Sequence, residues 1–186
     1  AAHLGRVFQD PMMGTCADMW IEENLALAKR RGKVRGLGWS ITSKERAEYR
    51  EMLAQLELGL EDRLSTKVGL LSGGQRQALT LLMATMNHPK LLLLDEHTAA
   101  LDPKTAEKVL NLSDRIIRED NLTALMVTHN MKDAIAHGNR LIMMNAGKII
   151  LDVSGEEKKA LTVDSLLAAF SKVSGSEFAN DRALLS

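Results

Sequence analysis

The sequence predicts an α/β fold built on a parallel sheet. Two strongly apolar runs, residues 91–95 and 122–128, are typical of buried strands, and a helical pattern follows each of them. Strands that alternate with helices pair in parallel and present functional side chains at their carboxyl ends. With 186 residues, 45% of them hydrophobic, the chain can bury a core of this kind.

The first part of the chain predicts the end of a strand, a turn and a helical subdomain. Residues 4–8 are strand-like and run into the polar turn Gln9-Asp10-Pro11. Residues 12–70 carry amphipathic helical patterns, with a helix over 21–28 and an exposed, basic, glycine-containing loop over 29–40. Thr42 and Glu45 match a capping box. The apolar stripe that follows has helical spacing, and its members are Tyr49, Met52, Leu53, Leu56 and Leu60.

The second part predicts the α/β elements themselves. A helix runs over 73–87 and is ended by Pro89, and Asp102-Pro103 caps another helix, over 103–119. A short helix over 131–137 is closed by Gly138, and strands 140–144 and 148–153 flank a hairpin turn. A last helix covers 163–170. From Ser171 the tail is polar, and we expect it to be mobile.

Composition excludes several classes of function. Lys+Arg and Asp+Glu both number 24, so the zero net charge gives no support for nucleic-acid binding through a broad basic field. No stretch approaches the ~18 apolar residues of a membrane span. The single cysteine, Cys16, excludes an internal disulfide and is expected to be a small buried residue. The methionines, Met12, Met13, Met143 and Met144 among them, are expected to fill the core.

Ser72-Gly73-Gly74-Gln75 opens the helix over 73–87 and predicts an anion site, because free backbone N–H groups and the helix dipole both point at such a ligand. Asp95 and Glu96 end an apolar strand, and two carboxylates there suit a magnesium–nucleotide centre. Asp95 would hold Mg²⁺, and Glu96 would orient or deprotonate the attacking water. The alternative is that Asp-Glu simply marks a solvated strand end.

Three further residues are weaker candidates when each is taken singly. His129 follows the next strand, where an imidazole could donate to a γ-phosphate, although a histidine there more often has a structural role. Gln9 offers an amide that can contact both Mg²⁺ and a water, but glutamines are common in turns. Asp102 could act in the site or merely cap the next helix, and the two roles are compatible.

In sequence order these pieces resemble the nucleotide-binding domain of ATP-binding-cassette (ABC) transporter ATPases over roughly residues 1–155. Leu71 to Gln75 matches the signature motif LSGGQ, and Leu91 to Glu96 matches the Walker B strand with its glutamate. Gln9 matches the Q-loop glutamine, Ala100 to Asp102 the D-loop and His129 the switch histidine. One departure is His97, where the family usually has proline.

The resemblance implies two such domains that close head to tail around ATP and Mg²⁺. Ser72, Gly73, Gly74 and Gln75 of one subunit would contact the γ-phosphate of ATP held by the other, and Asp102 would lie at this interface. Gln9, Glu96 and His129 would act in hydrolysis, and Asp95 with Gln9 would bind Mg²⁺. The implied partners are a second ATPase subunit, transmembrane permease subunits and a substrate-binding protein, at the cytoplasmic face of the membrane.

The family's phosphate-binding loop, G-x-x-x-x-G-K-[ST], should stand upstream of Gln9, and no match occurs. We therefore expect an α/β P-loop NTPase (ABC ATPase) core with a partly parallel sheet and an inserted helical subdomain, truncated before its N-terminal strands and inactive alone. The expected parts are a strand end and Q-loop (1–11), the helical subdomain (12–72), the ATPase core (73–155) and a C-terminal helix with a tail (156–186).

The leading hypothesis is an ATP-hydrolysing subunit of a membrane transporter. The sequence around Asp10-Pro11 and over 147–157 is similar to that of ATPases of bacterial uptake systems, some of them for amino acids such as tryptophan. The alternatives are a soluble ABC ATPase outside transport and a catalytically silent interaction module. Fused tandem cassettes or long coiled-coil insertions would indicate the soluble branches, and the sequence has neither.

Overall fold

The computed structural model describes residues 3–33 and 41–174, which form two compact units. The N-terminal unit is Ala1–Val127 and the C-terminal unit is Thr128–Ser186. Within the described residues no helix is long and apolar enough to span a bilayer. The four-part division expected from the sequence stays a prediction.

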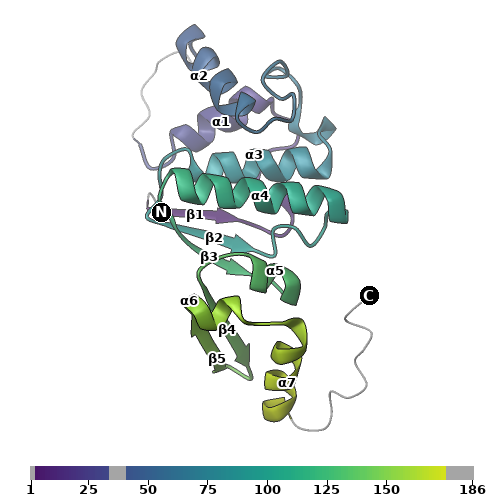
Figure 1. The fold of residues 1–186 in the computed structure, drawn as a ribbon. Helices are drawn as coiled ribbons and strands as arrows, with labels where there is room; N and C mark the ends of the chain where they lie inside the picture. The colour runs from purple at the N-terminus through teal and green to yellow at the C-terminus, as the bar shows by residue number, and fades with distance from the viewer. Residues whose placement is uncertain (1–2, 34–40, 175–186) are drawn as a thin grey trace. The chain divides into compact units, whose positions relative to one another are not determined.

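The N-terminal unit is built on a three-stranded parallel sheet in the order β1-β2-β3 (Figure 1). The strands are β1 (Leu4–Val7), β2 (Leu91–Asp95) and β3 (Thr123–Val127). Val7 pairs with Leu94, and Asp95 pairs with Val127, so all three strands end at the same edge. The parallel α/β sheet predicted from the alternating pattern is confirmed.

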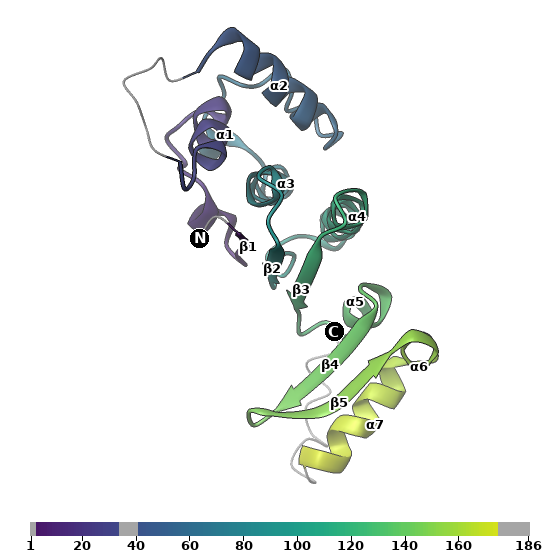
Figure 2. The same cartoon turned by 90° about the vertical axis from the view of Figure 1, so that its left-hand side faces the viewer.

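Helices α3 (Gly73–Thr85) and α4 (Pro103–Glu119) cover one face of this sheet (Figure 2). Their starting residues agree with the predicted caps, because Ser72 and Asp102 each accept a hydrogen bond from the backbone N–H three residues on. Val7, Leu92 and Leu94 point from the sheet into the core, where they join Leu79 and Leu81 of α3. This packing fixes the strand ends relative to the start of α3.

The expectation that 91–95 and 122–128 are buried strands, the first of them on both faces of the sheet, is wrong in this structure. β2 alternates between buried and partly buried residues, and Leu125 and Val127 of β3 are each about half exposed. The physical reason is that β3 pairs only with β2 among the described residues, and that Met126 packs against the core, so Leu125 and Val127 point to the opposite face of the sheet from α3 and α4. Apolar content alone could not reveal this.

The helical part of the N-terminal unit contains η1 (Pro11–Gly14), α1 (Ile21–Lys29), α2 (Ser43–Ala54) and η2 (Val68–Leu70). The predicted Thr42–Glu45 capping box is confirmed, with both reciprocal hydrogen bonds formed. All residues of the predicted apolar stripe that follows Thr42 are buried, except Met52, which is partly buried. Residues 34–40 of the predicted loop lie outside the described residues.

Helices α1 and α2 are joined by an ion pair with one buried partner. Arg46 donates from Nε and one terminal nitrogen to the two carboxylate oxygens of Glu22, at 2.7 and 3.0 Å. The Glu22 side chain is almost fully buried, whereas that of Arg46 is half exposed. The bidentate geometry is the form in which a buried carboxylate is best compensated.

The C-terminal unit contains α5 (Met131–Ala136), β4 (Arg140–Asn145), β5 (Lys148–Ser154), α6 (Gly155–Lys159) and α7 (Val163–Ser174). β4 and β5 form the predicted hairpin, and Ala146 and Gly147 both have positive φ at its turn. Helix α6 was not predicted. The predicted start of the tail at Ser171 is wrong, since α7 continues to Ser174, and residues 175–186 lie outside the described part.

Cys16 is exposed, so the expectation that it fills a buried position is wrong. The Asn24 side chain holds both backbone groups of Cys16, accepting from its N–H at 2.7 Å and donating to its carbonyl at 3.1 Å. The position of Cys16 is therefore set by its backbone, and the thiol does not need to pack. Met12, Met13 and Met144 are also exposed, against expectation.

Candidate nucleotide half-site

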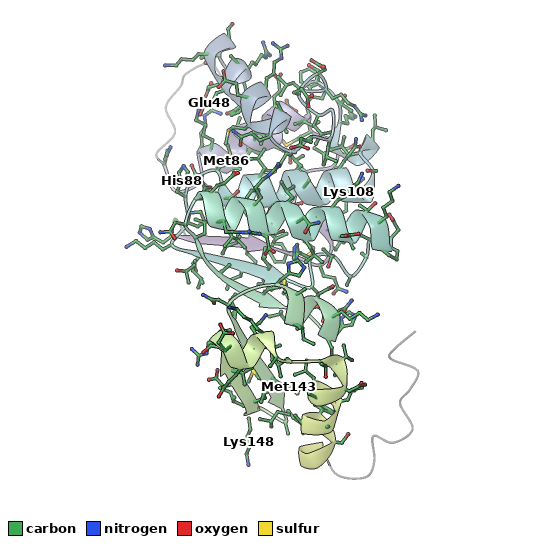
Figure 3. All side chains as sticks on the ribbon, in the orientation of Figure 1. Glu48, Met86, His88, Lys108, Met143 and Lys148 are labelled. Atoms are coloured by element: carbon green, nitrogen blue, oxygen red, sulfur yellow. The ribbon has the colours of Figure 1, made fainter. Side chains whose placement is uncertain are left out.

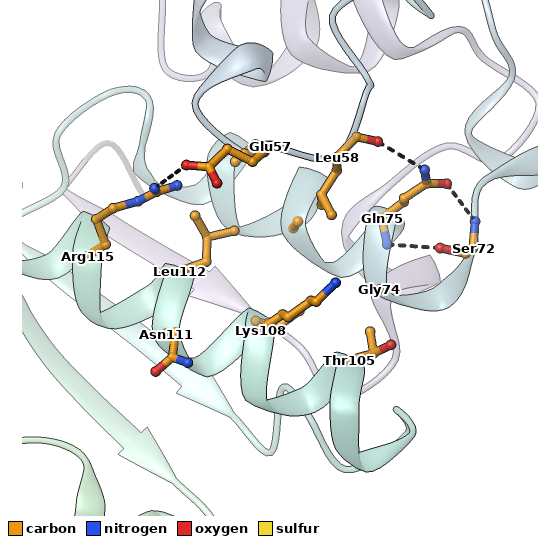
Figure 4. Close-up of a pocket in the computed structure, with 13 residues that line it drawn as sticks. Glu57, Leu58, Ser72, Gly74, Gln75, Thr105, Lys108, Asn111, Leu112 and Arg115 are labelled. Atoms are coloured by element: carbon orange, nitrogen blue, oxygen red, sulfur yellow. Dashed lines mark hydrogen bonds and ion pairs between the residues drawn. The ribbon is translucent and has the colours of Figure 1, made fainter.

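The signature residues form a capping box at the start of α3 (Figure 4). The Gln75 N–H donates to Ser72 Oγ at 3.3 Å, and the Ser72 N–H donates to Gln75 Oε1 at 3.2 Å. Gln75 Nε2 also donates to the carbonyl of Leu58, which holds the side chain in place. The N–H groups of Gly73 and Gly74 have no acceptor within the helix and therefore remain available to an anion at its N-terminus.

The two acids lie where the strands end, as expected. Asp95 pairs with Arg6 of the adjacent strand β1 at 2.7 Å, and both side chains are about half exposed. Glu96 has a left-handed backbone (φ 44°), and its N–H donates to the carbonyl of Val127 at 2.9 Å. A non-glycine residue held in this region of φ/ψ space is often found at functional sites. The bond to β3 fixes the direction in which the chain leaves the sheet.

Gln9 is exposed and follows β1 by two residues, so it lies at the same sheet edge as Asp95. The preceding carbonyl, that of Phe8, accepts a hydrogen bond from Gln77 Nε2 of α3 at 3.2 Å. Gln77 is buried, and the sequence motif did not distinguish it from a helix-surface residue. It connects the signature helix to the segment that carries Gln9.

Asp102 caps α4 by accepting from the N–H of Thr105 at 3.1 Å. Hydrogen bonds from the Thr105 side chain and backbone lower the pKa of the Asp102 carboxyl, so the group is ionised in the neutral range. The capping role is thus present in this structure. Because the Asp102 side chain is exposed, its capping role does not exclude a second role at an interface.

His97 is buried, which the sequence did not predict. Its Nε2 lies 3.1 Å from Ser113 Oγ of α4, and that hydroxyl donates to the carbonyl of Val109 at 2.8 Å. The contact ties the turn after Glu96 to the helix that begins at Pro103. No periodicity in the sequence signals it, because the two partners are 16 residues apart on different elements.

His129 belongs to the C-terminal unit and is exposed. Its expected place beside the acids stays a prediction. His88 lies just after α3, where it is exposed (Figure 3).

A groove of about 570 Å³ opens beside the signature residues, between the start of α3, α4 and the loop after α2 (Figure 4). Lys108 of α4 lies along it, and Arg115 closes one side through an ion pair with Glu57 at 2.8 Å. The groove exposes Ser72 and Gln75 while Gly74 and Thr105 line its floor. The signature end of α3 is thus open to solvent on this side.

Among the described residues, no three His, Cys, Asp or Glu side chains come together as a metal site. Mg²⁺ in nucleotide sites takes only one or two protein carboxylates, and phosphate and water complete its shell. Asp95 and Gln9 supply oxygen ligands of this kind at one sheet edge. These donors fit a Mg²⁺ ion: Asp95 and Gln9 would hold it, and it would neutralise phosphate charge, whereas in this structure the Asp95 carboxylate pairs with Arg6.

The fold and these residues define the class as a nucleotide-binding domain of the α/β type. A family model described as "ABC transporter" matches residues 1–99, and the chain belongs to this family. This match confirms the resemblance to ABC transporter ATPases that the sequence motifs indicated.

Two relatives illustrate the similarity. The tyrosine transport ATP-binding protein of Clostridioides difficile (strain R20291) is 50% identical over 167 residues, which are 90% of this chain and 66% of that protein. A methionine import ATP-binding protein, MetN, of Streptococcus pyogenes (serotype M4, strain MGAS10750) is 35% identical over 172 residues, 89% of this chain and 46% of that protein. The chain thus spans from about half to just under two thirds of these relatives.

Solved structures agree with the fold. The ADP conformation of MJ1267, an ATP-binding cassette of an ABC transporter, matches with a TM-score of 0.67 and 25% identity over 90% of this chain and 68% of that one. The dimeric cassette MJ0796 with ADP and Pi matches with a TM-score of 0.64 and 32% identity over 81% and 62%.

Proposed function

We propose that this chain is part of the ATP-hydrolysing subunit of a bacterial ABC importer for amino acids. The observation that carries the proposal is the Ser72–Gln75 capping box, which leaves the Gly73 and Gly74 N–H groups at an open helix end. Family membership and the names of the tyrosine and methionine relatives support the transport role. The subunit would lie at the cytoplasmic face of the membrane, bound to a permease.

The signature end acts on a nucleotide held by a second, head-to-tail subunit. The dipole of α3 and the two glycine N–H groups stabilise the γ-phosphate charge, and Ser72 and Gln75 keep the helix end in shape. Asp102 lies at the start of the neighbouring helix and contacts the same interface. The dimeric cassette MJ0796 supports this arrangement, since its structure also contains ADP and Pi.

The sheet edge acts on the chain's own nucleotide. Asp95 and Gln9 bind the Mg²⁺ ion, which neutralises phosphate charge when it is present. Glu96 orients and deprotonates the attacking water, and its backbone bond to Val127 keeps the carboxylate at the strand end. His129 donates to the γ-phosphate and responds to its loss.

An exposed apolar surface near Gln9 supports a permease as partner. Met13 and Leu70 are each about 70% exposed, and Met12 and Trp20 are also exposed. Arg76 connects the two sides of this surface, since it contacts the Met12 sulfur and the carbonyl of Gly69. Large exposed apolar side chains near one another are typical of an interaction surface. A substrate-binding protein would deliver the amino acid to the permease.

The test is MgATP hydrolysis by the protein expressed from its complete reading frame. Glu96→Gln should lower turnover by about 10²-fold or more, because it removes the general base, while ATP binding persists and a stable dimer accumulates. Glu51→Gln, on the exposed side of α2, is the matched control and should leave turnover unchanged. Unchanged turnover in Glu96→Gln would remove Glu96 from the mechanism, and no hydrolysis in the wild type would favour a silent interaction module.

A further inference from the structure

Thr105, in the first turn of α4, lies against the signature helix at its second glycine (Figure 4). A Cβ atom placed on Gly74 would lie 2.2 Å from Thr105 Cγ2, a separation that real side chains do not reach. The same Cβ would lie 3.6 Å from Thr105 Cβ and 4.0 Å from Oγ1, which are ordinary contacts. The methyl group of Thr105 alone therefore excludes a side chain at position 74.

The other side of Thr105 holds the D-loop aspartate. Its backbone N–H donates to Asp102 Oδ1 at 3.1 Å, and the Thr105 side chain helps to lower the pKa of that carboxyl. One threonine thus contacts two different motifs. The methyl group packs on the signature glycine, and the backbone N–H binds the carboxylate of Asp102.

We propose that Thr105 is a positioning residue that joins the signature motif to the D-loop, and that residue 74 is glycine because the Thr105 methyl occupies the space of a side chain. The inference rests on the proposed function for its catalytic consequence, whereas the packing can be tested without it. When α4 moves, Thr105 carries the N-terminus of α3 and Asp102 with it. The phosphate-binding end and the interface aspartate therefore keep one spacing.

The competing explanation is that Gly74 is glycine only so that a nucleotide can approach the backbone. Gly73 gives the comparison within the same motif. A Cβ at Gly73 would meet only Leu101 Cδ2, at 3.3 Å, and the end of a leucine side chain can move by a few tenths of an ångström. Crowding from inside the protein is thus severe at Gly74 and slight at Gly73.

The experiment is a set of double variants in the protein expressed from its complete reading frame, followed by thermal unfolding and MgATP hydrolysis. Gly74→Ala alone should lower the unfolding midpoint by about 5 °C and turnover by about tenfold, because the overpacked helix end must shift. Adding Thr105→Ser should restore both, since serine keeps the hydroxyl and removes the methyl. Adding Thr105→Val should restore neither, since valine keeps the methyl.

Gly73→Ala is the matched control, and Thr105→Ser should not change its behaviour. Restored midpoint with turnover still lost in Gly74→Ala/Thr105→Ser would overturn the proposal, because nucleotide approach would then explain the glycine. An unchanged midpoint in Gly74→Ala, or equal rescue by Thr105→Val, would also overturn it. If the wild type hydrolyses no ATP, the proposed function fails, and the unfolding midpoints still decide the role of the Thr105 methyl.

Discussion

Ser113→Ala should destabilise the protein through His97, a residue in another element. Ser113 has one hydroxyl proton, which it donates to the carbonyl of Val109 at 2.8 Å. Its oxygen must therefore accept from His97 Nε2, 3.1 Å away, and this places a proton on Nε2. The variant removes the acceptor of a buried N–H group, since His97 is only 2% exposed.

The expected loss follows from that burial. A buried donor that loses its acceptor costs about 1–3 kcal/mol, more than the net value of an ordinary hydrogen bond. Thr85→Val is the matched control, because Thr85 is equally buried and its hydroxyl bonds only carbonyls of its own helix, at Leu81 and Leu82. Those carbonyls keep their helix bonds, so the control should cost about 0.5 kcal/mol.

Urea unfolding of the protein expressed from its complete reading frame measures both free energies. The His97→Leu background isolates the pair, since Ser113→Ala should there cost about 1 kcal/mol less than in the wild type. If Ser113→Ala is no more damaging than Thr85→Val, or costs the same with and without His97, the hydrogen bond does not hold the turn after Glu96 and the argument is refuted.

Three further outcomes are expected. Ser72→Arg should abolish ATP-driven dimer formation in size-exclusion chromatography and spare nucleotide binding, because a long cation fills the helix end that faces the partner's phosphate; normal hydrolysis would contradict the head-to-tail model. Burial and the nearby Glu45 carboxylate raise the pKa of Tyr49 to about 12, so its phenolate absorbance should appear well above pH 10. Because the folded pKa is raised, the stability from neutral Tyr49 is complete below pH 10 and is lost towards pH 12, and Tyr49→Phe should not show this loss. Arg46→Met should destabilise the protein more than Glu22→Gln, because it leaves the Glu22 carboxylate buried and unpaired; the reverse order in urea unfolding would argue against the pair.

Local patterns predicted the elements of this fold well, because caps and periodicity depend on residues close in sequence. The start of α2 at Thr42, of α3 at Ser72 and of α4 at Asp102 all agree with the structure. The predicted burial of β3 does not agree with the structure. Leu125 is as apolar as a core residue, and only its neighbours in the fold decide its exposure. Met13 was misassigned for the same reason.

The site was predictable where its residues form a contiguous motif and not where they meet across elements. Asp95 and Glu96 stand at the strand end that the sequence indicated. The partners that hold the site in shape were not predictable, since His97 meets Ser113 and Gly74 meets Thr105 only after the helices pack. The sequence motif indicates that residue 74 is glycine, but it does not show why. The Thr105 methyl group that leaves no room for a side chain there belongs to another helix.

Helix α3 takes part in two close contacts between a glycine and a threonine methyl group. Through them it connects two parts of the proposed site. At its start Gly74 lies against Thr105, and two turns later Thr80 lies against Gly14, where an added Cβ would come within 2.3 Å of the threonine methyl. At both places a threonine methyl group occupies the space that a side chain on the glycine would need, and interiors packed at crystal-like density resist sliding at such contacts. We therefore expect a shift of the segment between Gln9 and Gly14 to displace α3 and its signature end as well. Under the proposed function, a permease that pushes on the exposed methionines of that segment would act on the nucleotide interface through this helix.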